Sequence, residues 1–93
     1  MNIGIIGLGY VGVVTGVCLS SIGHKIYGCD ISKKKIQMLK NGEMPFLEKD
    51  CDELLIKSIK NKNIFFSSNL EQTVNNSDLI FICVGTPSEE TGA

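Results

Sequence analysis

The sequence predicts an α/β fold in which one parallel β-sheet carries helices on both of its faces. Two patterns lead to this fold class. Four short apolar segments alternate along the chain with segments whose apolar residues recur at helical spacing. All four strand candidates are apolar throughout, which is typical of parallel strands covered on both faces. Since the chain has 93 residues, of which 43% are hydrophobic, no more than one domain is expected.

The first half of the chain is expected to fold as strand, helix, strand, helix. The β-branched run Asn2–Gly7 is typical of a buried strand, and the small and apolar residues after it keep helical spacing up to Gly23, the expected end of that helix. A second strand is expected over Lys25–Asp30. Ser32 is the expected N-cap of a second helix, which ends near Asn41.

The second half begins with a connector around Pro45, because the residue before a proline is disfavoured in helices. A helix that Asp50 caps is then expected to end near Asn61, and a third strand to cover Asn63–Ser67.

A brief helix and a fourth strand complete the prediction. Ser68 is the expected cap of the helix, because Glu71 follows it at the spacing of a capping box. The fourth strand is expected over Asp78–Val84, covered on both faces. A doubly wound sheet of this kind continues to a fifth and a sixth strand, so residues 1–93 are expected to be a partial domain.

The charge balance excludes some classes of partner. Nine basic and ten acidic residues leave a formal charge of −1, which gives no electrostatic basis for nucleic-acid binding. All nine basic residues are lysines, so phosphate contacts must come from backbone N–H groups or from lysine. Glycines interrupt the apolar N-terminal run, and no basic stretch precedes it as in a secretory signal. No membrane partner and a cytoplasmic location are therefore expected.

The cysteines and the single histidine predict neither a metal site nor a catalytic residue. Cys18, Cys29, Cys51 and Cys83 form no C-x-x-C pair, and they are expected to be reduced and mostly buried. His24 has no neighbouring side chain that would make it a base, and an exposed turn position is expected.

The segment Gly7-Leu8-Gly9-Tyr10-Val11-Gly12 is a G-x-G-x-x-G motif that directly follows a strand and opens a helix. In dinucleotide-binding folds, Gly7 allows the tight turn and Gly9 lets the pyrophosphate approach the backbone. Gly12 lets the helix pack closely on the sheet. The N–H groups and the dipole of the helix N-terminus then favour the phosphates. The motif in this context predicts a dinucleotide site in a Rossmann-like fold.

Asp30 ends the second strand eighteen residues after Gly12, where such folds place a carboxylate that accepts hydrogen bonds from the adenosine ribose. A carboxylate there would repel the 2′-phosphate of NADP, so NAD is the predicted cofactor. Val84-Gly85-Thr86-Pro87 follow the fourth strand beside the topological switch point. From the residues alone, this segment is either part of the cofactor cleft or an ordinary turn.

Together these motifs resemble the UDP-glucose/GDP-mannose dehydrogenase family. GLGYVG, the spacing of Asp30 and Lys35, and VGTP occur together and in order, and the resemblance covers nearly all of the chain. It implies that Gly7–Gly12 bind the pyrophosphate, that Asp30 and Lys35 bind the ribose of NAD, and that Val84–Pro87 line the cofactor cleft. One departure follows Pro45, where the family usually shows P-x-x-E-P-G-L and this chain reads PFLEKDC.

The resemblance also implies an activity for the whole protein. The family oxidises the C6 hydroxyl of a nucleotide sugar to a carboxylate in two NAD-dependent steps, through a thiohemiacetal on a cysteine of a later domain. UDP-glucose is the expected substrate, and GDP-mannose or another nucleotide sugar is the alternative. Residues 1–93 would then carry no catalytic residue, the sugar nucleotide would bind through further domains, and a homo-oligomer is expected. A non-catalytic NAD-sensing module is the alternative from another class of function.

Overall fold

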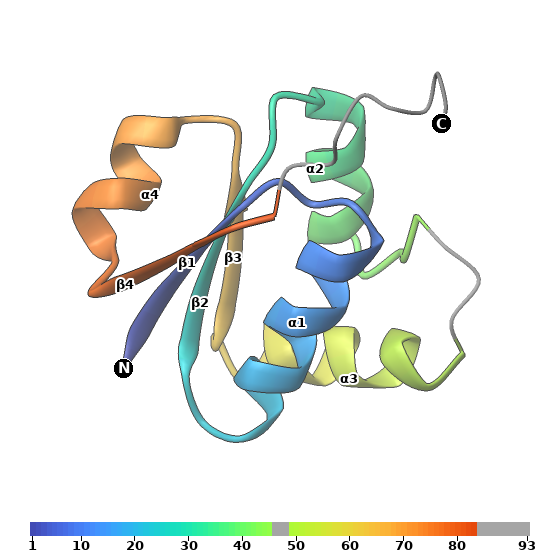
Figure 1. Ribbon diagram of the computed structural model, residues 1–93. Coiled ribbons are helices and arrows are strands. Elements are labelled where there is room, and N and C mark those ends of the chain that lie inside the picture. The colour runs from blue at the N-terminus through green and yellow to red at the C-terminus, as the bar shows by residue number, and fades with distance from the viewer. Residues whose placement is uncertain (46–48, 84–93) are drawn as a thin grey trace.

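The computed structural model describes residues 1–45 and 49–83 and contains one parallel sheet with four helices in that part of the chain. Figure 1 shows α1, α2 and α3 on one side of the sheet and α4 on the other, which confirms the predicted α/β fold with helices on both faces. The elements are, in order, β1 (Asn2–Ile6), α1 (Tyr10–Ser21), β2 (Lys25–Cys29), α2 (Lys33–Lys40), α3 (Lys49–Lys60), β3 (Ile64–Ser67), α4 (Leu70–Asn76) and β4 (Leu79–Ile82).

The strand order is β3-β2-β1-β4, so β1 lies between β2 and β4. Ile6 pairs with Cys29 of β2 and with Ile82 of β4, and Cys29 pairs in turn with Ser67 of β3. Because all four strands are parallel, their carboxyl ends meet at one edge of the sheet. The loops after β1, β2 and β3 therefore come together at that edge, where ligands of open α/β sheets bind.

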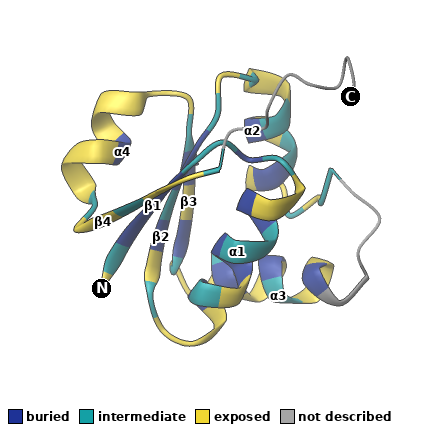
Figure 2. Cartoon of the chain, in the orientation of Figure 1, coloured by how far each residue is buried: buried dark blue, intermediate teal, exposed yellow. Residues whose placement is uncertain are grey.

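The core fills the space between the sheet and the helices α1–α3. In Figure 2 the buried residues line the inner sides of these helices and the central strands. Ile36 and Leu39 bury the inner face of α2, and Leu55 does the same for α3. The remaining members of this cluster are Ile3, Ile5, Leu8, Val13, Val17, Ile26, Ile64 and Phe66.

Strand β4 differs from its expected environment. It was predicted to be covered on both faces, but Leu79, Phe81 and Ile82 are 46%, 39% and 71% exposed. The strand pairs with β1 along one side, and no strand pairs with its other side in the described part of the chain. The prediction of burial was therefore wrong here, because an apolar sequence indicates a strand but not how many neighbours it has.

Helix ends agree with the predictions except at the starts of α3 and α4. The Ser32 Oγ accepts the Lys35 N–H at 3.2 Å and so caps α2 as predicted. At α4 the cap is Asn69, whose side chain accepts the Gln72 N–H at 2.9 Å, so the assignment of the cap to Ser68 was wrong. Asparagine caps as well as serine does, and the capping-box spacing alone did not separate the two. The predicted cap at Asp50 was also wrong, because α3 begins at Lys49 and Asp50 is its second residue; the capping spacing did not specify the first residue of the helix.

The cysteines are buried less often than expected. Cys29 and Cys51 are buried, Cys83 is partly buried and Cys18 is exposed, and no disulfide joins any of these four residues. His24 is partly rather than fully exposed, and its Nδ1 lies 3.4 Å from the amino group of Met1. Among the helices of residues 1–45 and 49–83, none is long and apolar enough to cross a membrane.

Candidate dinucleotide site

The glycine motif forms a tight turn between β1 and α1. Gly7 has a φ of 99°, a conformation that favours glycine, and its N–H donates to the Cys29 carbonyl oxygen at 2.9 Å. Gly9 is the N-cap of α1, with extended backbone at φ −76° and ψ −168°. A Cβ built on Gly9 would meet no atom within 4 Å, so the space in front of this residue is open. The first two glycines therefore have the tight turn and the accessible backbone that the motif predicted.

Gly12 is required for a different contact from the one expected. A Cβ at this position would overlap the carbonyl oxygen of Gly7 and would lie 3.4 Å from the Cβ of Cys83. The close approach thus joins α1 to the turn that precedes it and to the end of β4. The prediction of close packing is confirmed, but its main partner is the backbone of the motif itself.

The N-terminus of α1 faces the open space without a compensating charge. No side chain caps the helix at Gly9, and its first turn contains no acidic residue. The first amides of a helix have no acceptors within it, and together they carry a partial positive charge. Tyr10 and Val11, the next two residues of the motif and the first two of α1, are 49% and 64% exposed. The arrangement suits a bound phosphate group.

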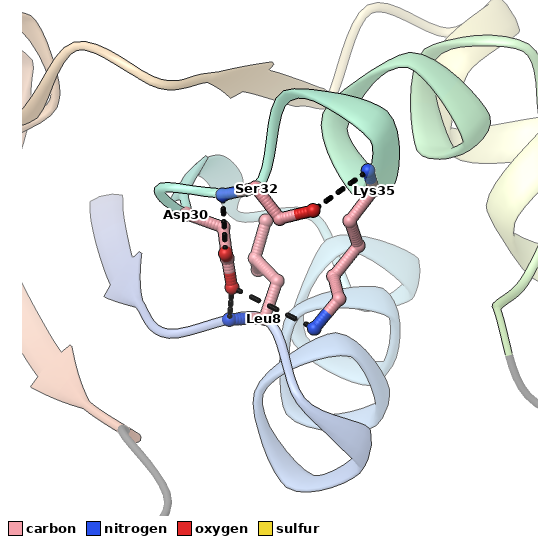
Figure 3. Close-up of polar contacts among 4 residues, drawn as sticks. All are labelled: Leu8, Asp30, Ser32 and Lys35. Carbon is pink, nitrogen blue, oxygen red and sulfur yellow. Dashed lines mark hydrogen bonds and ion pairs between the residues drawn. The ribbon is translucent and has the colours of Figure 1, made fainter.

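Asp30 connects the glycine turn to the loop before α2, as Figure 3 shows. Its Oδ2 accepts the Leu8 N–H at 2.8 Å, and its Oδ1 accepts the Ser32 N–H at 2.9 Å. The Lys35 Nζ lies 3.8 Å from Oδ2, and the two side chains are 28% and 13% exposed. A carboxylate offers about four acceptor positions, so these two hydrogen bonds leave about two for further donors such as ribose hydroxyls.

The lysines at the start of α2 differ in their distance from Asp30. Lys33 and Lys34 are exposed, and within the described residues only Lys35 of the three forms an ion pair with Asp30. Consecutive helical residues point in different directions, so the three ammonium groups do not converge on one position.

A mainly apolar pocket lies beside the Asp30 carboxylate, at the carboxyl ends of β1 and β2. Its volume is about 200 Å³. Ile31, 95% exposed, borders it on one side, and the start of α4 borders it on another. Its lining residues are Ile6, Gly7, Cys29, Asp30, Ile31, Ser68 and Leu70. An apolar pocket next to a ribose-binding carboxylate suits a flat base such as adenine.

Sequence reasoning found only part of this site. It missed Ile31, Ser68 and Leu70, because their contribution depends on how α4 docks beside β2. It also missed the bond between Ser32 N–H and Asp30, although the spacing of two residues is typical of an Asx-turn. Val84–Pro87 lie outside the described residues, so their assignment to the cleft stays a prediction.

Comparisons with known proteins agree with this geometry. The model of the UDP-glucose/GDP-mannose dehydrogenase family, NAD binding domain, matches residues 1–93. The chain is 41% identical over 91 residues to the UDP-glucose 6-dehydrogenase TuaD of Bacillus subtilis, covering 98% of this chain and 20% of that protein. It is 44% identical over 92 residues to a GDP-mannose 6-dehydrogenase of Pseudomonas syringae pv. syringae, covering 99% of this chain and 21% of that protein.

Solved structures support the same assignment. The structure superimposes on GDP-mannose dehydrogenase from Pseudomonas aeruginosa with a TM-score of 0.94 at 40% identity, over 100% of this chain and 21% of that one. For a UDP-glucose dehydrogenase from Pyrobaculum islandicum the TM-score is 0.87 at 32% identity, over 91% of this chain and 20% of that one. The chain spans about a fifth of the length of these proteins. It belongs to the UDP-glucose/GDP-mannose dehydrogenase family, as the NAD-binding domain of that family.

Proposed function

We propose that the protein containing this chain is a nucleotide-sugar 6-dehydrogenase, and that residues 1–93 hold the adenosine half of its NAD. The observation that carries the proposal is the family match over the whole chain. The site geometry supports it, because an open glycine turn, an uncapped helix N-terminus and a carboxylate lie at the same edge of the sheet.

Each part of the cofactor half has residues that fit it. The pyrophosphate would lie in the open space before Gly9, against the N-terminus of α1. Asp30 and Lys35 would bind the ribose, and the pocket beside Asp30 would take the adenine. Val84–Pro87 are proposed to line the continuation of the cleft.

The same geometry favours NAD over NADP. A 2′-phosphate on this ribose would approach the Asp30 carboxylate, which is 13% exposed. Two like charges about 4 Å apart repel by about 4 kcal/mol at an effective dielectric constant near 20. Lys35 offsets part of this repulsion, so the figure is an upper bound on the discrimination.

Residues 1–93 would bind and orient the cofactor rather than carry out the chemistry. Bound NAD supplies the oxidising equivalents for converting a sugar C6 hydroxyl into a carboxylate. The groups that bind the sugar nucleotide and move its protons are proposed to lie in further domains. A cytoplasmic location and a homo-oligomeric state are proposed for the whole protein.

UDP-glucose is the substrate we propose first, in line with relatives 41% and 42% identical that are UDP-glucose 6-dehydrogenases of Bacillus subtilis. GDP-mannose is the second candidate, favoured by relatives up to 44% identical and by a TM-score of 0.94. The test is to incubate the intact protein with NAD and each sugar nucleotide, and to follow NADH formation. Formation of NADH with either sugar nucleotide supports the dehydrogenase assignment and identifies the substrate. NAD binding without NADH formation from UDP-glucose, GDP-mannose or UDP-N-acetylmannosamine, the substrate named for a similar structure, would contradict it.

A further inference from the structure

The turn that would receive the pyrophosphate is attached to the rest of the described fold at Gly7 and at Leu8. Two of its first three residues, Gly7 and Gly9, are glycines, which restrict the backbone least. Gly7 is held by its N–H bond to Cys29, and Leu8 is held by its buried side chain, which is 1% exposed. No side chain caps the helix at Gly9. Between Gly7 and the first turn of α1, the Leu8 N–H bond to Asp30 is therefore an attachment of particular importance.

This bond joins two segments that are 22 residues apart in the sequence. Its acceptor is charged, and hydrogen bonds to charged groups contribute more to stability than neutral ones do. The carboxylate is itself held in place, since its other oxygen accepts the Ser32 N–H and Lys35 lies beside it (Figure 3). The carboxylate held by these contacts binds the Leu8 amide, one residue before the open space at Gly9.

We propose that Asp30 has a second role beside ribose binding, as a positioning residue that holds the glycine turn in the shape that accepts the pyrophosphate. This inference rests on the proposed NAD-binding function. It makes a specific statement about the energetics. Loss of the carboxylate should weaken the binding of a dinucleotide even when the ribose has no hydroxyl groups for Asp30 to bind.

The test compares two ligands and two variants of the intact protein. The ligands are NAD and an NAD analogue whose adenosine ribose lacks both hydroxyls. The test variant is Asp30→Ala. The matched control is Asp78→Ala, because the Asp78 Oδ2 accepts the Asn2 N–H at 3.2 Å and so joins two elements at the opposite edge of the sheet. Calorimetric titration measures each dissociation constant, and urea unfolding measures the stability of each variant.

We expect Asp30→Ala to bind the dideoxy analogue about tenfold more weakly than the unmodified protein does, since hydrogen bonds to charged groups are of that size. The affinity of Asp30→Ala for NAD should fall by a larger factor, because the hydrogen bonds between Asp30 and the ribose hydroxyls are lost as well. Asp78→Ala should bind both ligands within about twofold of the unmodified protein, even where it unfolds more easily. This comparison separates positioning of the turn from a general loss of stability.

Equal binding of the analogue by Asp30→Ala and the unmodified protein, with only NAD weakened, would overturn the second role and leave the proposed NAD site intact. Absence of NAD binding by the unmodified protein would overturn the proposed function itself, and this inference with it. Should Asp30→Ala not fold, Asp30→Asn keeps the side-chain volume and lacks the charge. A smaller loss of analogue binding is expected for this variant, and unchanged binding would again overturn the second role.

Discussion

Replacing Gly12 by alanine should destabilise the fold, although alanine is the better helix former. In an ordinary helix interior this change gains about 1 kcal/mol. Here the new Cβ would overlap the carbonyl oxygen of Gly7 and would also lie 3.4 Å from the Cβ of Cys83. The Gly7 oxygen belongs to a turn with a φ of 99° and cannot rotate away as a side chain would.

The magnitude follows from these opposing effects. Overpacking a filled site costs about 1–3 kcal/mol, and contact with rigid backbone places Gly12 at the upper end of that range. After the gain in helix propensity is subtracted, a net loss of about 2 kcal/mol in the free energy of unfolding is expected. For a domain of this size, that corresponds to a fall in melting temperature of about 8–16 °C.

Gly9→Ala is the matched comparison, because its effect should fall on binding instead. Gly9 has a φ of −76°, which alanine adopts without strain, and a Cβ there meets no atom within 4 Å. The stability of this variant should change by less than about 0.5 kcal/mol. The methyl group would occupy the space proposed for the pyrophosphate, so NAD binding should weaken by about tenfold or more.

Circular dichroism during urea unfolding and calorimetric titration with NAD measure the two quantities. If Gly12→Ala were as stable as the unmodified chain, the reasoning from the Gly7 contact would be refuted. If Gly9→Ala bound NAD normally, the proposed position of the pyrophosphate would be refuted.

The remaining predictions concern the cap of α4, the choice of cofactor and the exposed strand. Asn69→Ala should lower the free energy of unfolding by about 1 kcal/mol, whereas Ser68→Ala should have little effect; the reverse order in urea unfolding would contradict the observed cap. NADP should bind at least about tenfold more weakly than NAD, and Asp30→Ser should narrow that gap in calorimetric titration; an unchanged ratio would exclude repulsion by Asp30. A polypeptide of residues 1–93 should self-associate through β4, and Ile82→Lys, at a residue 71% exposed, should reduce this in light scattering. A polypeptide that stays monomeric at high concentration would contradict self-association through the unpaired edge of β4.

The elements of this fold could be predicted from the sequence because each depends on residues close together in the chain. The apolar run at β1, the glycine turn and the Ser32 cap all follow from patterns a few residues long. The same holds for the position of Asp30 at the end of β2, which predicted a carboxylate near the glycine turn. These local signals were enough to establish the fold class and the cofactor.

Contacts between elements depended on register and docking, which short patterns do not contain. The hydrogen bond from the Leu8 N–H to Asp30 depends on strand register. β1 and β2 pair so that Ile6 lies beside Cys29, and the loops that follow these two residues are therefore adjacent. The pocket beside Asp30 exists because α4 begins next to the end of β2. The exposure of β4 reflects the absence of a neighbouring strand on its outer side in the described chain, and no property of the β4 sequence specifies it. Sequence alone thus determined the glycine turn and the carboxylate of the site. The tertiary structure decided which groups touch them and which residues line the pocket, because these contacts join residues that are distant along the chain.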